Sequence, residues 1–265
     1  MRASHTATHG LVFCAVVLWA TVVSAQTTTA PSQSTIEQEQ VPCNQYGVST
    51  VVRCMGHDLV RVVQGDSLRW LLAGGALAGG SLFVDDEIAD ALASPTRGSA
   101  VVLGDHLGQA GVQFAIPGAI YLVGRATGHD DTSDLGIMLL RTQVVNGIYT
   151  RALKLIPRAR PYSDSATPGQ GSFPSGHASA SFATATVFQR KWGWRAGVPA
   201  YAVATFISVT RLQNMHFLSD VTFGAALGIA SGLAINVPGK HSAVAPIVAP
   251  GVVGLSVTIG GHPSL

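Results

Sequence analysis

Charged residues are scarce in this 265-residue sequence. Asp, Glu, Lys and Arg make up 11% of it, whereas soluble domains average about 25%. Apolar residues make up 47%, and the mean hydropathy is +0.35. The formal net charge is only +2 and no run of Lys or Arg occurs, so nothing in the sequence favours nucleic-acid binding. The composition indicates either very large buried faces or contact with lipid.

Cysteine is also rare, with three residues in the whole chain. Residues 1–25 contain a short apolar run followed by small residues, which indicates a secretory signal; an uncleaved anchor is the alternative. Cleavage would remove Cys14 and leave Cys43 and Cys54, ten residues apart. In an oxidising compartment this pair predicts a local disulfide, because no further Cys or His stands at the spacing that a zinc site requires.

The remaining sequence divides by composition into three regions. Residues 26–66 begin with a Thr-, Ser- and Gln-rich stretch and are expected to form a flexible tether that contains the Cys43–Cys54 loop. Residues 67–237 alternate apolar segments with polar breaks. Residues 238–265 form a tail, in which the β-branched segment 252–259 predicts a short strand or an extended chain.

The apolar segments of the central region are longer than ordinary strands and show no strand-like alternation, so we predict an all-α, six-helix domain. The expected helices are 70–84, 107–124, 135–153, 178–188, 196–209 and 221–237. Two charge-free runs, 107–124 and 221–239, approach the length of a membrane span, and small residues are frequent in them. A membrane protein is therefore favoured over a helical globule with an unusually apolar core.

Three short motifs between residues 154 and 220 carry the chemistry. In the Pro-Ser-Gly-His motif at 174–177, Ser175 is a good helix N-cap and Gly176 permits close approach to the backbone. A helix N-terminus binds anions, and His177 in its first turn can reach such an anion. The Arg-Pro pair of Arg160 suits bidentate phosphate contact, while Arg158 is expected to face solvent.

The last motif contains a second histidine with a carboxylate four residues later. His216 and Asp220 lie on one face of a helix, where the carboxylate can take the Nδ1 proton and leave Nε2 free to attack. Arg211 precedes His216 by five residues, so the two need an intervening turn, which Asn214 can supply.

Together these motifs resemble those of the phosphatidic acid phosphatase type 2 (PAP2)/haloperoxidase superfamily, with the signature K-x6-R-P, P-S-G-H and S-R-x5-H-x3-D. The resemblance covers residues 67–237. The sequence departs from the signature twice: Leu153 occupies the lysine position, with Lys154 one residue late, and Thr210-Arg211 stands one residue closer to His216 than usual. On a helix, a shift of one residue turns the side chain by about 100° around the helix axis, so Lys154 would reach the phosphate only if the segment is unwound or shifted.

The resemblance implies a metal-independent phosphatase without cofactor. His216 would be the nucleophile of a phosphohistidine intermediate, oriented by Asp220, and His177 would be the general acid. The residues expected to bind the phosphate are Arg160, Arg211, Ser175, Gly176 and Lys154. The implied substrate is a lipid phosphate, a polyprenyl pyrophosphate or a small phosphate ester.

The same resemblance places the protein in the bacterial cell envelope, either in the inner membrane with a periplasm-facing site or soluble in the periplasm. A vanadium-dependent haloperoxidase is one alternative, because that branch holds vanadate with the same residues. A catalytically idle envelope scaffold is another, because of the two departures from the signature.

Overall fold

The computed structural model describes residues 48–163, 169–237, 242–249 and 252–259, and these residues belong to one compact unit. The predicted signal, residues 1–25, lies outside the described residues. The elements in chain order are α2 (Val48–Val62), α3 (Gly65–Ser81), the 3-10 turn η1 (Leu82–Val84), α4 (Asp85–Leu92), α5 (Ser99–Gly108), α6 (Ala110–Thr127), α7 (Asp130–Leu153), α8 (Gly176–Trp192), α9 (Trp194–Thr210), α10 (Leu218–Ala234), β1 (Ser242–Ala249) and β2 (Val252–Ile259).

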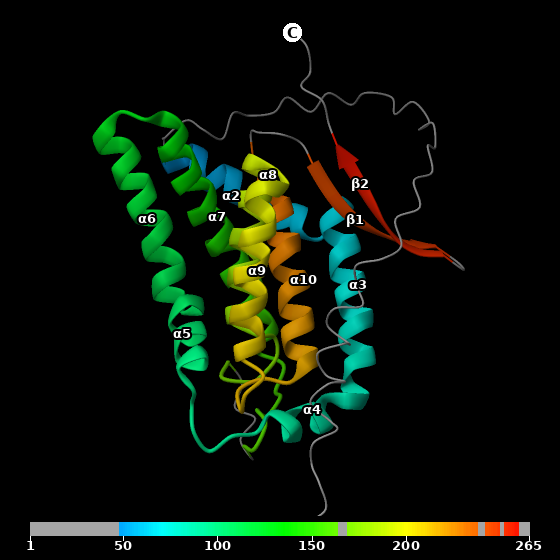
Figure 1. Ribbon diagram of the computed structural model, residues 1–265. Coiled ribbons are helices and arrows are strands. Elements are labelled where there is room, and N and C mark those ends of the chain that lie inside the picture. Colours follow the sequence, from blue (N-terminus) through cyan, green and yellow to red (C-terminus); the bar gives the residue numbers. More distant parts are fainter. Residues whose placement is uncertain (1–47, 164–168, 238–241, 250–251, 260–265) are drawn as a thin grey trace, which may run out of the picture. The chain divides into compact units, whose positions relative to one another are not determined.

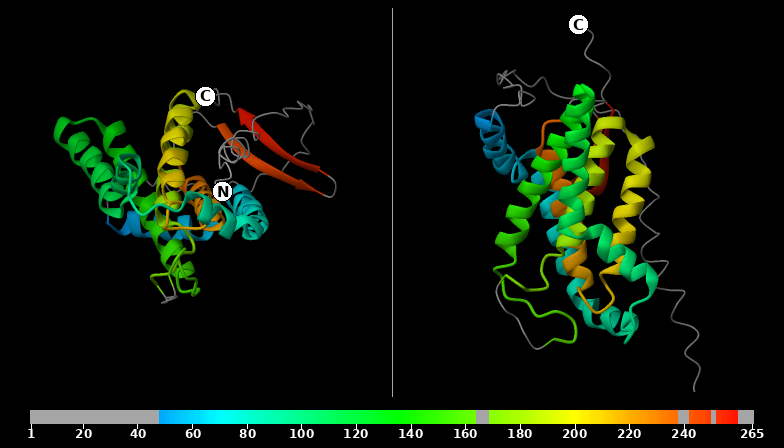
Figure 2. Two further views of the ribbon diagram at one scale, coloured as in Figure 1. Left: turned by 60° about the horizontal axis from the view of Figure 1, so that its bottom comes forward. Right: turned by 90° about the vertical axis from the view of Figure 1, so that its left-hand side faces the viewer.

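The all-α prediction is confirmed. Among the described residues, the six helices with 17 or more residues are α3 and α6 to α10, and each coincides with one of the six expected segments. The extended segment expected at 252–259 is strand β2. It pairs antiparallel with β1, with Ser242 opposite Ile259, and β1 packs against α3 (Figures 1 and 2).

One part of the expected tether has a different structure, because residues 48–62 form helix α2. Cys54, Asp58 and Val62 recur every four residues and are buried, so they form one face of the helix. Asp58 accepts hydrogen bonds from Arg141 of α7, and both side chains are 3% exposed. Cys54 is disulfide-bonded, and its partner lies outside the described residues; the pairing with Cys43 remains a prediction.

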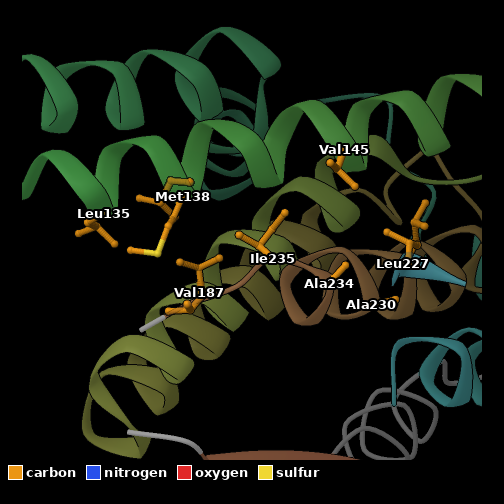
Figure 3. Close-up of a cluster of buried hydrophobic side chains, with 11 residues drawn as sticks. Leu135, Met138, Val145, Val187, Leu227, Ala230, Ala234 and Ile235 are labelled. Atoms are coloured by element: carbon orange, nitrogen blue, oxygen red, sulfur yellow. The ribbon is translucent and has the colours of Figure 1, made fainter. Parts of the chain in front are cut away.

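The main hydrophobic core lies where α7, α8 and α10 meet (Figure 3). Leu135, Met138 and Val145 extend from α7 toward Val187 of α8 and Leu227 of α10. Ala230, Ala234 and Ile235 continue the cluster along α10. Burial of these side chains fixes the three helices that carry most of the motif residues at their ends.

Glycines bring α8 and α10 unusually close. Gly224, Gly228 and Gly232 recur every four residues along α10. A Cβ at Gly224 would lie 2.6 Å from the carbonyl oxygen of Ser175, and one at Gly228 would lie 2.2 Å from that of Ser179. No side chain fits there, so glycine at these positions permits the contact that sets the start of α8 beside the start of α10.

The described residues contain one helical stretch long and apolar enough to cross a membrane, Gly65–Leu92, with a mean hydropathy of 1.3. Helices α5 and α6 meet that standard together but are bent by 56° at their junction. Only 17% of the apolar window in Gly65–Leu92 is buried. Leu72 on α3 is 64% exposed and Phe83 in η1 is 90% exposed, so this stretch presents apolar side chains outward.

The motif residues gather at one end of the helices. Helices α7 and α9 end there, and α8 and α10 begin there, at the lower end of Figure 1. Helix α4 and the loop that leads into α5 lie at the same end (Figure 1). Because consecutive long helices run in alternating directions, residues far apart in the sequence meet at this end; Asp105 and Arg211, for example, are 106 positions apart and in contact.

Candidate active site

His216 lies in a tight turn between α9 and α10. Its backbone N–H donates to the carbonyl of Arg211 at 3.0 Å, and Asn214 adopts a φ of 61°, in the left-handed region that asparagine tolerates. The Asn214 side chain is fixed by hydrogen bonds with the backbone of Ser94, one of them 2.6 Å long. The turn expected at Asn214 is thus present, and it accommodates the shortened spacing between Arg211 and His216.

A serine hydroxyl mediates between His216 and its carboxylate. Nδ1 of His216 is 3.7 Å from Oδ2 of Asp220, which is longer than a hydrogen bond, but 3.3 Å from Oγ of Ser172. Ser172 donates to the same Oδ2 of Asp220, which also accepts the backbone N–H of Phe217 at 2.9 Å. Asp220 therefore orients His216 largely through Ser172, and Nε2 remains on the opposite side of the ring.

The environment of His216 keeps its imidazole neutral. Burial lowers the pKa of His216 to about 4; the carboxylate of Asp220 opposes this effect and the guanidinium of Arg160 adds to it. Nη1 of Arg160 lies 3.4 Å from Nε2 of His216 and donates to the carbonyl of Met215 at 2.9 Å. A neutral ring whose Nε2 carries a lone pair next to a guanidinium is suited to attack an anion bound by that guanidinium.

Lys154 reaches the same site despite its displaced position in the sequence. Lys154 is the C-cap residue of α7, and its backbone still follows the helix, with φ −66°, ψ −9° and an N–H that donates to the carbonyl of Thr150 at 3.0 Å. The backbone therefore does not unwind before Lys154, and its side chain reaches the site from the last turn of α7. Its Nζ donates to the carbonyl of Gly171 at 2.8 Å. Burial, with Arg160 nearby, lowers the pKa of Lys154 to about 8, against the opposing effect of Asp220.

The Pro-Ser-Gly-His motif begins helix α8, as predicted. Ser175 is the N-cap residue, and its side chain accepts from the backbone N–H of Ala178 at 3.5 Å. The backbone N–H of Ser175 donates to the carbonyl of Asp220 at 3.0 Å, which ties the start of α8 to the start of α10. A Cβ on Gly176 would meet only a methyl group of Thr150 at 3.7 Å, so a ligand can come close to the backbone there.

Asp105 of α5 connects His177 and Arg211. Its Oδ1 accepts from Nη1 of Arg211 at 2.6 Å and lies 3.1 Å from Nε2 of His177. The Arg211 side chain is 3% exposed, and its Nε has no hydrogen-bond partner within the described ranges. Arg211 therefore retains a buried N–H donor for a substrate oxygen.

Arg158 does not simply face solvent. Its Nη1 is 3.2 Å from Oδ1 of Asp220, and its Nη2 donates to Oδ2 of Asp85 at 2.7 Å. Asp85, at the start of α4, also accepts the backbone N–H of Ser219 at 2.9 Å. Arg158 thus contacts the Asp220 oxygen that does not face His216, and Asp85 anchors Arg158 and the neighbouring Ser219.

Sequence reasoning missed Ser172, Asp105 and Asp85. Ser172 stands two residues before the Pro-Ser-Gly-His motif, and this proximity is the signal that could have found it. Asp105 and Asp85 belong to no motif and approach the site from segments that precede it by many residues. Among the described residues, no group of three or more His, Cys, Asp or Glu is arranged to hold a metal ion.

A cavity of about 570 Å³ opens beside Arg160. It lies between the loop that follows α4 and the loop that carries Arg160. Its lining residues are Ala93, Ser94, Pro95, residues 160–163 and Asn214. The mixture of prolyl, tyrosyl and hydroxyl groups provides both apolar and hydrogen-bonding surface next to the proposed nucleophile.

Comparison with known proteins supports the family predicted from the motifs. The family model described as the PAP2 superfamily matches residues 135–245. Over 102 residues the chain is 38% identical to a lipid A 1-phosphatase from Porphyromonas gingivalis, a match that covers 37% of this chain and 21% of that protein. The chain thus spans about a fifth of the length of this curated relative.

The chain is also similar to the crystal structure of a transmembrane PAP2-type phosphatidylglycerolphosphate phosphatase from Bacillus subtilis. The TM-score is 0.42 and the identity 20%, over 70% of this chain and 93% of that chain. The family prediction rests on the sequence motifs and the family match, and it is confirmed. The segment that matches the PAP2 superfamily model, residues 135–245, contains all three motifs.

Proposed function

We propose that this protein is a metal-independent phosphatase of the bacterial cell envelope that hydrolyses a phosphorylated lipid through a phosphohistidine intermediate. The observation that carries the proposal is the placement of His216. Its ring is buried, Nδ1 faces Ser172 and Asp220, and Nε2 lies 3.4 Å from the guanidinium of Arg160. This arrangement suits a nucleophile that attacks a phosphate held by arginine.

The phosphate would be bound by Arg160, Lys154 and Arg211 together with the start of α8 at Ser175 and Gly176, where the backbone N–H of Gly176 is the donor because that of Ser175 already donates to Asp220. Three cationic side chains can neutralise the equatorial oxygens, which is the role that a metal ion has in other phosphoryl-transfer enzymes. The first amides of a helix have no intrahelical partner, so the start of α8 offers further donors. Catalysis at such a site comes mainly from positioning and charge stabilisation.

In the proposed first step, Nε2 of His216 forms a bond to phosphorus while the bond from phosphorus to the leaving oxygen breaks. His177 gives its proton to that oxygen. The positive charge that develops on His216 is stabilised by Asp220, directly and through Ser172. In the second step His177 takes a proton from water, the water oxygen attacks phosphorus, and the bond to Nε2 breaks, which releases inorganic phosphate.

A phosphorylated lipid is the substrate class that the relatives favour, because the Porphyromonas gingivalis relative is a lipid A 1-phosphatase. The exposed apolar side chains of the stretch Gly65–Leu92 support a membrane location, in which the substrate would reach the site from the bilayer. We propose the inner membrane, with the site facing the periplasm, as the location.

The test is phosphoenzyme formation with phosphate esters that have good and poor leaving groups. His216→Ala should abolish both phosphoenzyme and turnover. His177→Ala should still form phosphoenzyme slowly from p-nitrophenyl phosphate, whereas turnover of an alkyl phosphate should fall by about 10²–10⁴-fold, the usual contribution of a general acid. EDTA should leave wild-type turnover unchanged, and orthovanadate should inhibit it.

Several outcomes would count against the proposal. Substantial activity of His216→Ala toward both esters would show that another residue is the nucleophile. Loss of activity in EDTA that a divalent ion restores would reject the metal-independent mechanism. Oxidation of bromide by peroxide in the presence of vanadate, without phosphatase activity, would favour a haloperoxidase, and inactivity in both assays would favour a scaffold.

A further inference from the structure

Asp105 contacts both the proposed general acid and one of the proposed phosphate ligands, although it belongs to none of the motifs. Its carboxylate lies 2.6 Å from Arg211 and 3.1 Å from Nε2 of His177, and its own backbone carbonyl lies 3.1 Å from the same Nε2. We propose that Asp105 is a positioning residue that keeps the proton on Nε2 of His177 and thereby makes Nδ1 the atom that exchanges protons with substrate and water. This inference rests on the proposed phosphatase function.

The tautomer follows from the partners of the ring. Within the described part of the chain, both polar contacts of the His177 ring are made by Nε2, and both partners are oxygens of Asp105. A carbonyl and a carboxylate can only accept, so the ring nitrogen that faces them carries hydrogen in the neutral as well as in the protonated form. The neutral ring therefore has its lone pair on Nδ1.

In both chemical steps the proton is then given or taken by the same atom, Nδ1 of His177. Protonated His177 gives the Nδ1 proton to the leaving oxygen as the phosphorus–oxygen bond breaks and the bond to His216 forms. The neutral ring that remains has a lone pair on Nδ1, which takes a proton from the attacking water as the bond between phosphorus and His216 breaks. Nε2 keeps its hydrogen and donates it to Asp105 throughout both steps, so the ring does not have to turn between them.

Helix α5 also restricts where the ring can lie. Gly108 is three residues after Asp105, and a Cβ on it would lie 2.5 Å from Cδ2 of His177 and 2.8 Å from a methyl carbon of Ile207. The backbone of α5 at Gly108 therefore lies directly against the imidazole. One helix supplies both the hydrogen-bond acceptors and the surface against which the ring packs.

Arg211 is held by the same carboxylate. The ion pair with Asp105 uses Nη1, while the buried Nε remains without a partner in the described ranges. The charged and titratable groups around Asp105 are Arg211, Arg97 and His177, with Nη1 of Arg97 at 3.3 Å from Oδ2. Arg160 acts electrostatically on Arg211. In these surroundings Asp105 is the negative charge that favours protonated His177, while Arg211 disfavours it.

The experiment compares Asp105→Asn with wild type, using p-nitrophenyl phosphate and an alkyl phosphate. Asparagine keeps the size of the side chain but removes its charge, while the backbone carbonyl still accepts from Nε2. We expect kcat for the alkyl phosphate to fall about 10–100-fold, within the usual contribution of a general acid. For p-nitrophenyl phosphate, which needs little protonation, kcat should fall less than about 5-fold.

The pH profile and a matched control separate positioning from a structural effect. Without the carboxylate His177 loses its proton more easily, so the basic limb of kcat/KM for the alkyl phosphate should move to lower pH. Asp105→Glu should restore part of that limb. Asp66→Asn removes an aspartate that pairs with Arg69 at 2.8 Å on α3, and it should change neither kcat nor the pH profile.

Two results would overturn the inference. An equal loss for both esters with an unmoved basic limb would show that Asp105 only supports the fold. Faster turnover and tighter vanadate binding in Asp105→Asn would show instead that the carboxylate competes with phosphate for Arg211 and His177.

A measurement on the wild-type protein keeps the inference testable if Asp105→Asn does not fold. Nitrogen-15 NMR of histidine-labelled protein, assigned by the loss of one signal pair in His177→Gln, should show neutral His177 with hydrogen on Nε2. Hydrogen on Nδ1 would reject the inference. If wild-type protein hydrolyses neither ester, the proposed function fails, whereas the tautomer measurement still judges the role of Asp105.

Discussion

At the residue scale, the site depends on a few polar side chains that the fold buries. His216 is 3% exposed and Asp220 is fully buried, so their charges are governed by neighbours more than by water. Ser172 and Arg158 each contact one oxygen of the Asp220 carboxylate. The carboxylate is thereby fixed on both sides, and through Ser172 it fixes the ring of the proposed nucleophile.

Lys154 provides a prediction about pH at this scale. Because burial lowers its pKa to about 8, its positive charge is present below that pH and is lost as the pH rises through it. Inorganic phosphate is largely a dianion above pH 8, so its own charge then changes little. We expect the dissociation constant for phosphate to rise about 10-fold between pH 8 and pH 10 in wild type, which is the effect of about 1.4 kcal/mol.

The control for this prediction is a pair of variants measured by calorimetry over the same pH range. Lys154→Met should bind phosphate more weakly at pH 7 and lose most of the pH dependence. Lys191→Met removes a lysine that pairs with Asp131 at the other end of α8, and it should behave like wild type. Parallel curves for wild type and Lys154→Met would show that Lys154 does not bind the phosphate.

At the element scale, the close contact of α8 with α10 determines the spacing between the motifs. The glycines of α10 permit the contact, and the hydrogen bond from Ser175 to the carbonyl of Asp220 fixes the start of α8 relative to the start of α10. A small change in the distance between these helices would therefore move His177 relative to His216. Positioning errors of about 1 Å can cost on the order of 10²-fold in rate.

Gly228→Ala tests this contact. The added methyl group would lie 2.2 Å from the carbonyl oxygen of Ser179, so α8 and α10 must move apart. We expect a loss of about 1–3 kcal/mol in the free energy of unfolding, as for other overpacked cores, together with a lower kcat. Thermal unfolding and turnover in the same detergent would measure both effects.

Gly79→Ala is the matched control, because a Cβ at Gly79 of α3 would have no neighbour within 4 Å. Alanine is favoured over glycine in a helix by up to about 1 kcal/mol, so this variant should be no less stable than wild type. If both variants unfolded at the wild-type temperature, the α8–α10 contact would be less tightly packed than the structure indicates.

At the scale of the whole molecule, apolar side chains are exposed on several helices. They include Leu72 on α3, Leu122 on α6 and Val198 on α9, each more than 60% exposed. Soluble monomers rarely expose large contiguous apolar patches. We therefore expect these surfaces to face lipid, in line with the proposed membrane location.

Fractionation tests this location. When the full-length protein is expressed in bacteria, we expect it to sediment with membranes, to resist extraction by alkaline carbonate, and to dissolve in mild detergent. A known periplasmic protein and a known integral membrane protein in the same cells serve as controls. Recovery in the periplasmic fraction without detergent would contradict the membrane location, while leaving the proposed phosphatase chemistry untouched.

The sequence by itself determined the long helices, and its motifs indicated the family and the residues proposed for the site. Six apolar segments of helical length became six helices, and the three motifs contain His177, His216, Asp220 and Arg160. These features are local, because length, periodicity and cap residues act within a few positions of each other. The tether expected at 48–62 was wrong, because these residues form helix α2. The contact that stabilises its buried face is not local: Asp58 pairs with Arg141, 83 residues away.

Only the tertiary structure decided how the motifs are completed. It placed the loop of Gly171 within reach of Lys154 at the end of α7, and it formed the short turn between Arg211 and His216 with Asn214 in the left-handed region. It also brought Asp105 to His177 and Arg211. Asp105 lies on a different helix from both partners, so its distance from them and its burial depend on how the helices pack. Helix packing cannot be derived from the spacing of residues in the sequence.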